Sequence, residues 1–288
     1  MLKCGDRELL LGTRTFIMGI LNITPDSFSD GGKFLSLDAA LKQTDLMLQS
    51  GVDIIDIGGE STRPFAAMVS PAAELALVLP VIKALIAQGI NNLSIDTRNA
   101  STAKACLEEG VSWVNDVSAF SHDEKMWEAA KHADVVVLMH SRGTPPEMQK
   151  GTIVYDNVVL DIAAYLKNRV QFAVEKGFSA QRILVDPGIG FGKKLLHNLD
   201  LIKKLDHFQG IGAGVLCGLS SKAFIGELTG ITQANQRDNA TLGALAWAVS
   251  AGADMVRVHN VKAVSEMLKV VDALKYGGEK HEDLYQAR

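Results

Sequence analysis

Eight short apolar runs recur along the chain, each ending in a polar residue, and segments with helical spacing lie between them. The runs are rich in Ile, Val, Leu and Met without polar alternation, which is typical of strands covered on both faces. We expect strands at residues 15–22, 53–59, 92–97, 113–117, 135–140, 182–186, 214–220 and 255–259. Because strands and helices alternate, the pattern predicts an α/β fold, a single (β/α)8 TIM barrel. The alternative is an open, doubly wound parallel sheet.

Two of the intervening segments show clear helical patterns. The first is expected to begin after a Ser36 cap, with Asp38 in its first turn, and to end at Gly51. Its expected apolar face comprises Leu37, Ala40, Leu41, Thr44, Met47 and Leu48. The second helix ends at Gly177, and its expected apolar stripe comprises Ile162, Leu166, Val170 and Val174.

Length and composition narrow the class of protein. The 288 residues suffice for one barrel domain spanning 1–288, with a core at about 15–275. A formal net charge of −4 gives no indication of a nucleic-acid partner or of an acidic membrane surface. No stretch reaches the ~18 apolar residues of a membrane span. The three cysteines are far apart and lack metal-ligand spacing, so free thiols in a reducing cytoplasm are expected.

Polar residues gather at the predicted strand ends, and all strand ends of a barrel open onto one face, where chemistry takes place. They are Asn22, Asp56, Asp96, Asn115, His140, Asp186, Ser220 and His259. Asp96, Asn115 and Asp186 together suit a ligand edge rich in N–H donors, such as a 2-amino-4-oxo pyrimidine ring. The alternative for each of the three is a cap on the following helix.

Three basic residues are placed to meet an anion or a flat ring. Arg257 and His259 lie on the same side of one strand, because side chains alternate. A guanidinium stacks on rings and binds anions, and a histidine at a strand end suits a phosphate. Lys222 lies at the start of an expected helix, where an anion or a ring carbonyl is a favourable partner. The alternatives are a core histidine bonded to backbone and a solvated lysine.

Three connections after strand ends are long and rich in Pro, Gly, Ser and Thr, at residues 23–36, 60–70 and 141–155. Loops of this length often act as lids, and the simpler alternative is an exposed connection. The glycine-rich run at 188–193 lets the backbone pass close to a ligand, but it is not by itself a nucleotide-binding motif.

Eight stretches match one known family in that family's order. They are MGILNITPDSFSDGG, DIIDIGGESTRP, LSIDT, WVNDV, VVLMH, ILVDPGIGFGK, GLSSK and MVRVH. On these stretches, which run from residue 15 to about 260, the chain resembles the dihydropteroate synthases, the pterin-binding TIM-barrel family of folate biosynthesis. The first two stretches together are highly specific.

The resemblance implies a fold, a reaction and a set of site residues. The fold is the (β/α)8 barrel with long lid loops after strands 1 and 2. The implied transferase joins (7,8-dihydropterin-6-yl)methyl diphosphate to 4-aminobenzoate, giving 7,8-dihydropteroate and diphosphate. The residues implied to bind the pterin diphosphate are Thr62, Asp96, Asn115, Met139, Asp186, Lys222, Arg257 and His259. Those implied to surround 4-aminobenzoate are Phe28, Arg63, Pro64, Phe191 and Ser221.

The same resemblance implies a cofactor and catalytic roles. Mg²⁺ would be held by Asn22 and bridge the diphosphate, whose other oxygens and waters complete its shell. Asp30, Lys222 and Arg257 would be catalytic, with Asp30 stabilising positive charge on the pterin methylene. An SN1-like path fits this electron-poor carbon, and no protein nucleophile is required. The expected partners are these two small substrates and a second copy in a homodimer.

Three positions depart from the family's usual pattern, and two other functions stay open. Ser221 stands where members usually have Arg or Lys, Phe65 where Gly usually follows Arg63–Pro64, and Asn260 where Asp is common. The first two concern the 4-aminobenzoate pocket and its response to sulfonamides. They motivate a pterin-binding paralogue without synthase activity as one alternative. The other is a methyltetrahydrofolate-dependent methyltransferase, which would need neither the first lid motif nor the Arg257–His259 pair.

Overall fold

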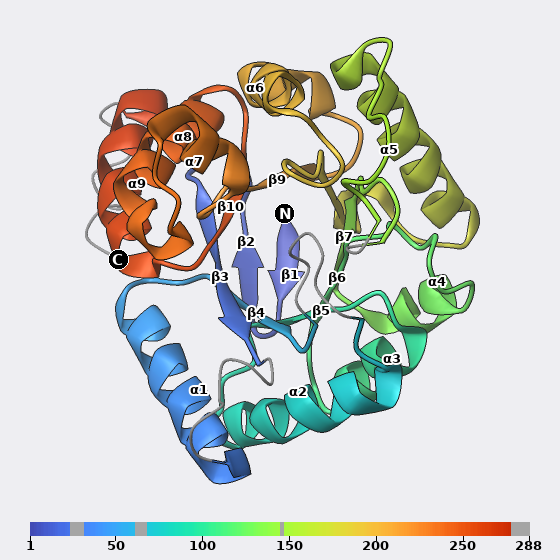
Figure 1. The fold of residues 1–288 in the computed structure, drawn as a ribbon. Helices are drawn as coiled ribbons and strands as arrows, with labels where there is room; N and C mark the ends of the chain where they lie inside the picture. The colour runs from blue at the N-terminus through green and yellow to red at the C-terminus, as the bar shows by residue number, and fades with distance from the viewer. Residues whose placement is uncertain (24–31, 61–67, 145–146, 278–288) are drawn as a thin grey trace.

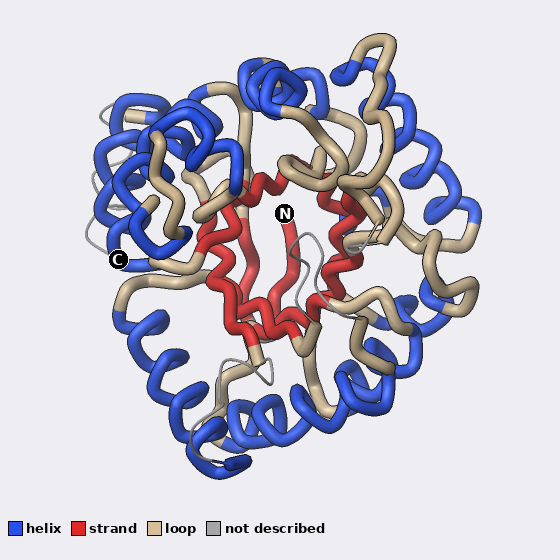
Figure 2. The backbone as a smooth tube through the Cα atoms, in the orientation of Figure 1, coloured by secondary structure: helices blue, strands red, loops and turns tan. Residues whose placement is uncertain are grey.

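The structure, a computed structural model, describes residues 1–23, 32–60, 68–144 and 147–277, without the side chains of residues 32–36. Eight parallel strands close into a barrel and helices surround it, which confirms the predicted fold class (Figures 1 and 2). Around the barrel the strands follow the order β10-β3-β4-β5-β6-β7-β8-β9. Their bounds are β3 Phe16–Asn22, β4 Ile54–Gly58, β5 Leu93–Asp96, β6 Trp113–Asp116, β7 Val135–Met139, β8 Ile183–Asp186, β9 Gly214–Gly218 and β10 Met255–Val258.

Nine α-helices are described between and after these strands. They are α1 Gly32–Gln49, α2 Pro71–Ala87, α3 Ala100–Glu108, α4 Met126–Ala129, α5 Val158–Glu175, α6 Leu195–Lys203, α7 Ala223–Thr229, α8 Asp238–Ser250 and α9 Val261–Tyr276. Short 3-10 turns are η2 Ala130–His132, η3 Ala180–Arg182, η4 Leu205–Phe208 and η5 Ala234–Gln236. In the described part of the chain, no helix combines the length and the apolar character that a membrane span requires.

Two details of the predicted helices are wrong. Helix α1 begins at Gly32, so Ser36 lies inside the helix rather than at its cap. The last five residues of the expected loop 23–36 are therefore helical. The stripe on α5 uses Ala173 rather than Val174, because Ala173 is fully buried and Val174 is 39% exposed. Gly51 and Gly177 do follow α1 and α5, each with positive φ.

A hairpin that the sequence pattern did not predict closes the N-terminal end of the barrel, where the parallel strands begin. Strands β1 (Leu2–Cys4) and β2 (Arg7–Leu9) pair antiparallel. Their buried side chains join an apolar cluster inside the barrel, which includes Phe16, Met18, Ile54, Trp113, Val135, Val137, Leu184, Leu216 and Met255. The indole Nε1 of Trp113 donates to the carbonyl of Lys3 over 2.8 Å. The barrel interior is therefore sealed at its N-terminal end.

This apolar layer determines which residues face the barrel mouth. Side chains on a strand alternate between its faces, so the residue two positions after an inward one also points inward. Ile54, Trp113 and Leu184 belong to the inner cluster. Asp56, Asn115 and Asp186 each follow by two positions. Met139 follows Val137 and Arg257 follows Met255 in the same way, so a polar layer lies directly above the apolar one.

Candidate active site

Four side chains from four strands form a bonded group in the polar layer. Arg257 donates from Nε to Asp56 Oδ2 and from Nη2 to Asp96 Oδ2, both over 2.6 Å. Asn115 donates from Nδ2 to the same Asp56 oxygen over 2.9 Å. Asp56, Asp96 and Asn115 are buried, and the Arg257 side chain is 17% exposed. The two carboxylates therefore converge on one guanidinium, which reaches from β10 across β3, and the amide joins the group through Asp56.

A third acid, Asp186, and a lysine complete the layer. Asp186 accepts from the backbone N of Gly188 over 2.7 Å. Lys222, just before α7, donates from Nζ to the carbonyl of Ile189, and Nζ lies 4.2 Å from the centre of the Phe191 ring. The turn after Asp186 has positive φ at Gly188, where a Cβ would lie 1.9 Å from a backbone oxygen of His140. Glycine is therefore required for this turn to close on the site.

Burial changes the pKa of the groups in this layer. It raises the pKa of Asp96 to about 7, against the opposing effect of Arg257 and with a smaller contribution from the charge of Asp56. It also raises the pKa of Asp186, which Lys222 partly offsets. Burial lowers the pKa of Lys222 to about 8, although Asp186 favours its charged form. Shifts of this kind, in a group of converging side chains, are typical of functional sites.

A buried lysine supports the loop that carries Phe191. Lys193 is 4% exposed, and its Nζ lies 2.9 Å from His140 Nδ1 and donates to the carbonyl of Phe191 over 3.0 Å. Burial lowers the pKa of His140 to about 3, so the ring is neutral and accepts from the lysine. His140 packs edge-on against Tyr165, with ring centres 4.9 Å apart. His140 thus faces away from the barrel mouth, because the preceding Met139 points inward.

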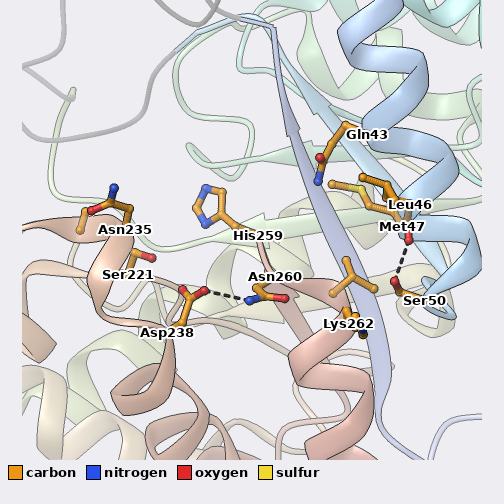
Figure 3. Close-up of a pocket in the computed structure, with 12 residues that line it drawn as sticks. Gln43, Leu46, Met47, Ser50, Ser221, Asn235, Asp238, His259, Asn260 and Lys262 are labelled. Atoms are coloured by element: carbon orange, nitrogen blue, oxygen red, sulfur yellow. Dashed lines mark hydrogen bonds between the residues drawn. The ribbon is translucent and has the colours of Figure 1, made fainter.

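A cavity of about 510 Å³ lies beside the barrel mouth, between α1 and the start of α9 (Figure 3). Ser221 and His259 both line it, whereas the bonded carboxylates of the polar layer do not. Ser221 is held at a positive φ of 57°, with its N donating to Thr241 Oγ1 and its carbonyl accepting from Arg237. His259 Nδ1 lies 2.9 Å from Ser220 Oγ. These contacts fix the two loops that face the cavity.

Comparison with known proteins places this arrangement in a family. Residues 18–259 match the family described as pterin binding enzyme. The chain belongs to this family. It is 43% identical to the dihydropteroate synthase of Streptococcus pyogenes over 260 residues, which cover 90% of this chain and 95% of that protein.

This pterin-binding enzyme is also similar to a solved bacterial structure and to a plant protein. The structure of Xanthomonas albilineans dihydropteroate synthase in complex with 7,8-dihydropteroate aligns with a TM-score of 0.84 at 37% identity, covering 95% of this chain and 98% of that one. A folate synthesis bifunctional protein of Arabidopsis thaliana is 39% identical over an alignment of 290 positions that covers 95% of this chain. The chain spans 60% of the length of that bifunctional protein.

Within this pterin-binding enzyme, the structure brings together most of the predicted pterin residues. Asp96, Asn115, Asp186 and Arg257 lie in the polar layer, with Lys222 beside it. Met139, 4% exposed, ends β7 and pairs in register with Asp186. Phe191 contacts Lys222, whereas Ser221 and His259 lie at the neighbouring cavity. Asn22 ends β3 with an exposed side chain. The predicted residues Phe28, Asp30, Thr62, Arg63 and Pro64, and the departure Phe65, lie outside the described residues.

Two members of the site were not assigned a role from the sequence. Asp56 was noted as a strand end only, although its spacing of two from the inward Ile54 is a signal that predicts its direction. Lys193 closes a glycine-rich run, and no local pattern shows that its side chain is buried and that its ammonium donates to the carbonyl of Phe191. The departure at Asn260 has a structural account, since its side chain caps α9 by accepting from Ala263 N and donates to Asp238.

Proposed function

We propose that this chain is a dihydropteroate synthase, which joins (7,8-dihydropterin-6-yl)methyl diphosphate to 4-aminobenzoate and releases diphosphate. The observation that carries the proposal is the set of inward oxygens of Asp96, Asn115 and Asp186. Carboxylate and amide oxygens accept from the N3–H and 2-amino groups of a pterin edge. The dihydropteroate synthases among the relatives, and the Xanthomonas structure with 7,8-dihydropteroate, support the same activity.

The chemistry requires a good leaving group rather than a protein nucleophile. The bond between the pterin methylene and a diphosphate oxygen breaks, the amine nitrogen bonds to the methylene, and the amine loses one proton. Arg257 and His259 would contact the departing diphosphate, because cationic and donor groups stabilise its charge. Lys222, next to Phe191, would hold the pterin ring. Burial raises the pKa of Cys4 and Cys106 to about 12 and that of Cys217 further, so none of these thiols is a reactive thiolate.

We propose that Ser221 and Phe191 contact 4-aminobenzoate, together with Phe28, Arg63 and Pro64. Ser221 lines the cavity beside the barrel mouth, and Phe191 packs on Lys222 at the edge of the polar layer. A hydroxyl at residue 221 donates a hydrogen bond to the carboxylate but supplies no charge. Two roles stay predictions, because the residues lie outside the described part of the chain. They are the contact of Thr62 with the diphosphate and the stabilisation of the positive methylene by Asp30.

The donor set at the end of β3 fits a magnesium ion that shares its shell with the substrate. Asn22 offers an exposed side-chain oxygen, and among the described residues no group of three or more His, Cys, Asp or Glu is placed to hold a metal. Mg²⁺ keeps several waters and takes phosphate oxygens, so one protein amide is enough. Bound there, Mg²⁺ would neutralise charge on the diphosphate. We predict that Asn22→Ala raises the Mg²⁺ concentration needed for half-maximal activity, and an unchanged magnesium titration would contradict the assignment.

The deciding experiment measures diphosphate release and dihydropteroate formation by purified protein with the dihydropterin diphosphate and Mg²⁺, with and without 4-aminobenzoate. We expect release that depends on 4-aminobenzoate and matches product formation. Asp186→Ala should abolish pterin binding, because the buried N–H donors of the ligand lose their acceptor. Tight pterin binding without condensation would instead favour the non-catalytic paralogue, and unchanged pterin affinity in Asp186→Ala would refute the site assignment.

We further propose that the protein is a cytoplasmic homodimer. Its three cysteines are free and buried, which suits a reducing compartment. The outer face of α8 carries no charged residue. Residues three or four positions apart share a helix face, and this face comprises Gly243, Ala246, Trp247 and Ser250. Trp247 is 59% exposed. A second copy of this chain is the occupant that we propose for this face.

A further inference from the structure

Asp56 is the innermost acid of the polar layer and is bonded on two sides. It lies in the middle of β4, directly above the apolar residues that seal the barrel, and it is fully buried. Its Oδ2 accepts from Arg257 Nε over 2.6 Å and from Asn115 Nδ2 over 2.9 Å. One oxygen therefore joins two residues that come from strands on opposite sides of β4.

The first consequence concerns the amide of Asn115. An ionised carboxylate only accepts hydrogen bonds, so Asp56 fixes the Asn115 side chain with its NH₂ group inward toward Asp56. The Oδ1 of Asn115 is then left on the other side as an acceptor. A pterin edge presents N–H donors. If the Asn115 amide were turned the opposite way, its NH₂ group would face these N–H donors and no hydrogen bond could form. The orientation that a pterin needs is thus determined by Asp56.

The second consequence concerns Arg257. Its guanidinium is held at two points, through Nε by Asp56 and through Nη2 by Asp96. Two bonds to a planar group fix both its position and its plane, which one carboxylate bonded through a single nitrogen does not. Asp96 is also proposed to accept a hydrogen bond from the ligand, whereas Asp56 is not. Asp56 therefore holds Arg257 whether or not the ligand is bound.

Stability alone does not explain a carboxylate at this position. Asp56 Oδ1 and the hydroxyl of Ser94, its cross-strand partner on β5, are both buried and have no hydrogen-bond partner in the described part of the chain. Unsatisfied buried polar atoms are destabilising, and a buried ion pair is often no more stable than apolar residues of similar volume. A function in the site accounts for the residue better than packing does.

We propose that Asp56 is a positioning residue of the pterin site, which fixes the amide orientation of Asn115 and the plane of Arg257. This inference rests on the proposed pterin-binding function of the same layer. Asp56 acts through its two partners and contacts neither the methylene nor the diphosphate. Its loss therefore weakens pterin binding and slows the transfer without removing any group that touches the reacting atoms.

The test compares two buried aspartates that each bond an arginine, Asp56 in the middle of β4 and Asp53 just before it. Asp56→Asn keeps the shape and removes the charge. Asp53→Asn is the matched control, because Asp53 bonds Arg14 and accepts from Ile17 N at the sealed end of the barrel rather than in the polar layer. For each purified protein we would measure the Kd for the dihydropterin diphosphate by calorimetry, the kcat, and the melting temperature. Asp56→Ser, smaller and also neutral, repeats the measurement if Asp56→Asn does not fold.

We expect Asp56→Asn to raise the pterin Kd at least tenfold and to lower kcat, while Asp53→Asn lowers the melting temperature and leaves Kd within twofold of the wild type. In a double-mutant cycle with Asn115→Ala, the losses in affinity should be less than additive, because both residues act through one amide. A Kd and kcat within twofold of the wild type in the folded Asp56 variant would overturn the proposal. A wild type that binds pterin but makes no dihydropteroate would refute only the synthase activity, and one that binds no pterin would refute both.

Discussion

At the scale of single residues, Asp96 should make pterin binding depend on pH. Burial raises the pKa of Asp96 to about 7, so below that pH the group carries a proton and presents a donor where the pterin needs an acceptor. We predict that pterin affinity increases as pH rises from 5.5 to 8.5, by up to about tenfold per pH unit below the pKa.

The measurement is the pterin Kd across this range, with circular dichroism at each pH to show that the protein stays folded. Asp96→Asn is the reference, because its amide does not titrate and the residual pH dependence then belongs to other groups and to the ligand. A wild-type profile that parallels the Asp96→Asn profile would contradict the prediction.

The residues of the site differ in how far sequence predicts them. Asp96, Asn115 and Asp186 each lie at the end of an apolar run, and strand alternation alone directs them into the barrel. The bond between Arg257 and Asp56 joins residues 201 apart across an intervening strand, so it depends on the barrel radius and on the register of β10 with β3. Neither quantity is encoded in a local pattern, which is why Asp56 acquired a role only from the structure.

At the scale of elements, the hairpin β1–β2 should contribute to stability and not to catalysis. Leu9 is 5% exposed and belongs to the cluster that seals the barrel, whereas the adjacent Leu10 is 54% exposed. We predict that Leu9→Ala lowers the free energy of unfolding by about 2–5 kcal/mol, because it leaves a cavity. Leu10→Ala, the matched control, should change it by less than about 0.5 kcal/mol.

Urea unfolding measures both hairpin variants, and kcat/KM of the folded proteins shows whether the site is affected. Equal stabilities for Leu9→Ala and Leu10→Ala would show that the hairpin does not seal the core. A loss of kcat/KM in folded Leu9→Ala would show that the lower apolar layer also shapes the polar one.

The elements themselves were predicted well where a pattern is long and periodic. Every barrel strand was located to within two residues at each end, since continuous apolar runs are characteristic of strands buried on both faces. The hairpin was not predicted, because β1 and β2 have only three residues each and β2 begins with the exposed Arg7 and Glu8. Helix α1 begins before Ser36 although Ser36–Asp38 resembles a cap, because a capping residue is tolerated inside a helix that tertiary packing holds.

At the scale of the whole molecule, the surface of α6, α7 and α8 is unusual for an exposed region. These three helices contact one another, and each carries a large exposed apolar side chain: Leu196, Leu228 and Trp247 are 70%, 54% and 59% exposed. A helix exposed on one face normally carries charge there, whereas the outer face of α8 carries none. Large exposed apolar side chains on neighbouring helices are typical of protein interfaces.

A homodimer through this surface leads to the last prediction. A chain of 30.9 kDa should have twice that mass in light scattering at micromolar concentration, and Trp247→Glu should return it to the monomer mass, because a carboxylate in an apolar interface loses its hydration. Leu160→Glu is the matched control, since Leu160 is 58% exposed on α5, which is not one of the three helices of this surface. A monomeric wild type, or a dimer in Trp247→Glu, would rule out this interface. Because α7 begins directly after Lys222, loss of the dimer should also reduce pterin affinity, whereas Leu160→Glu should leave it unchanged.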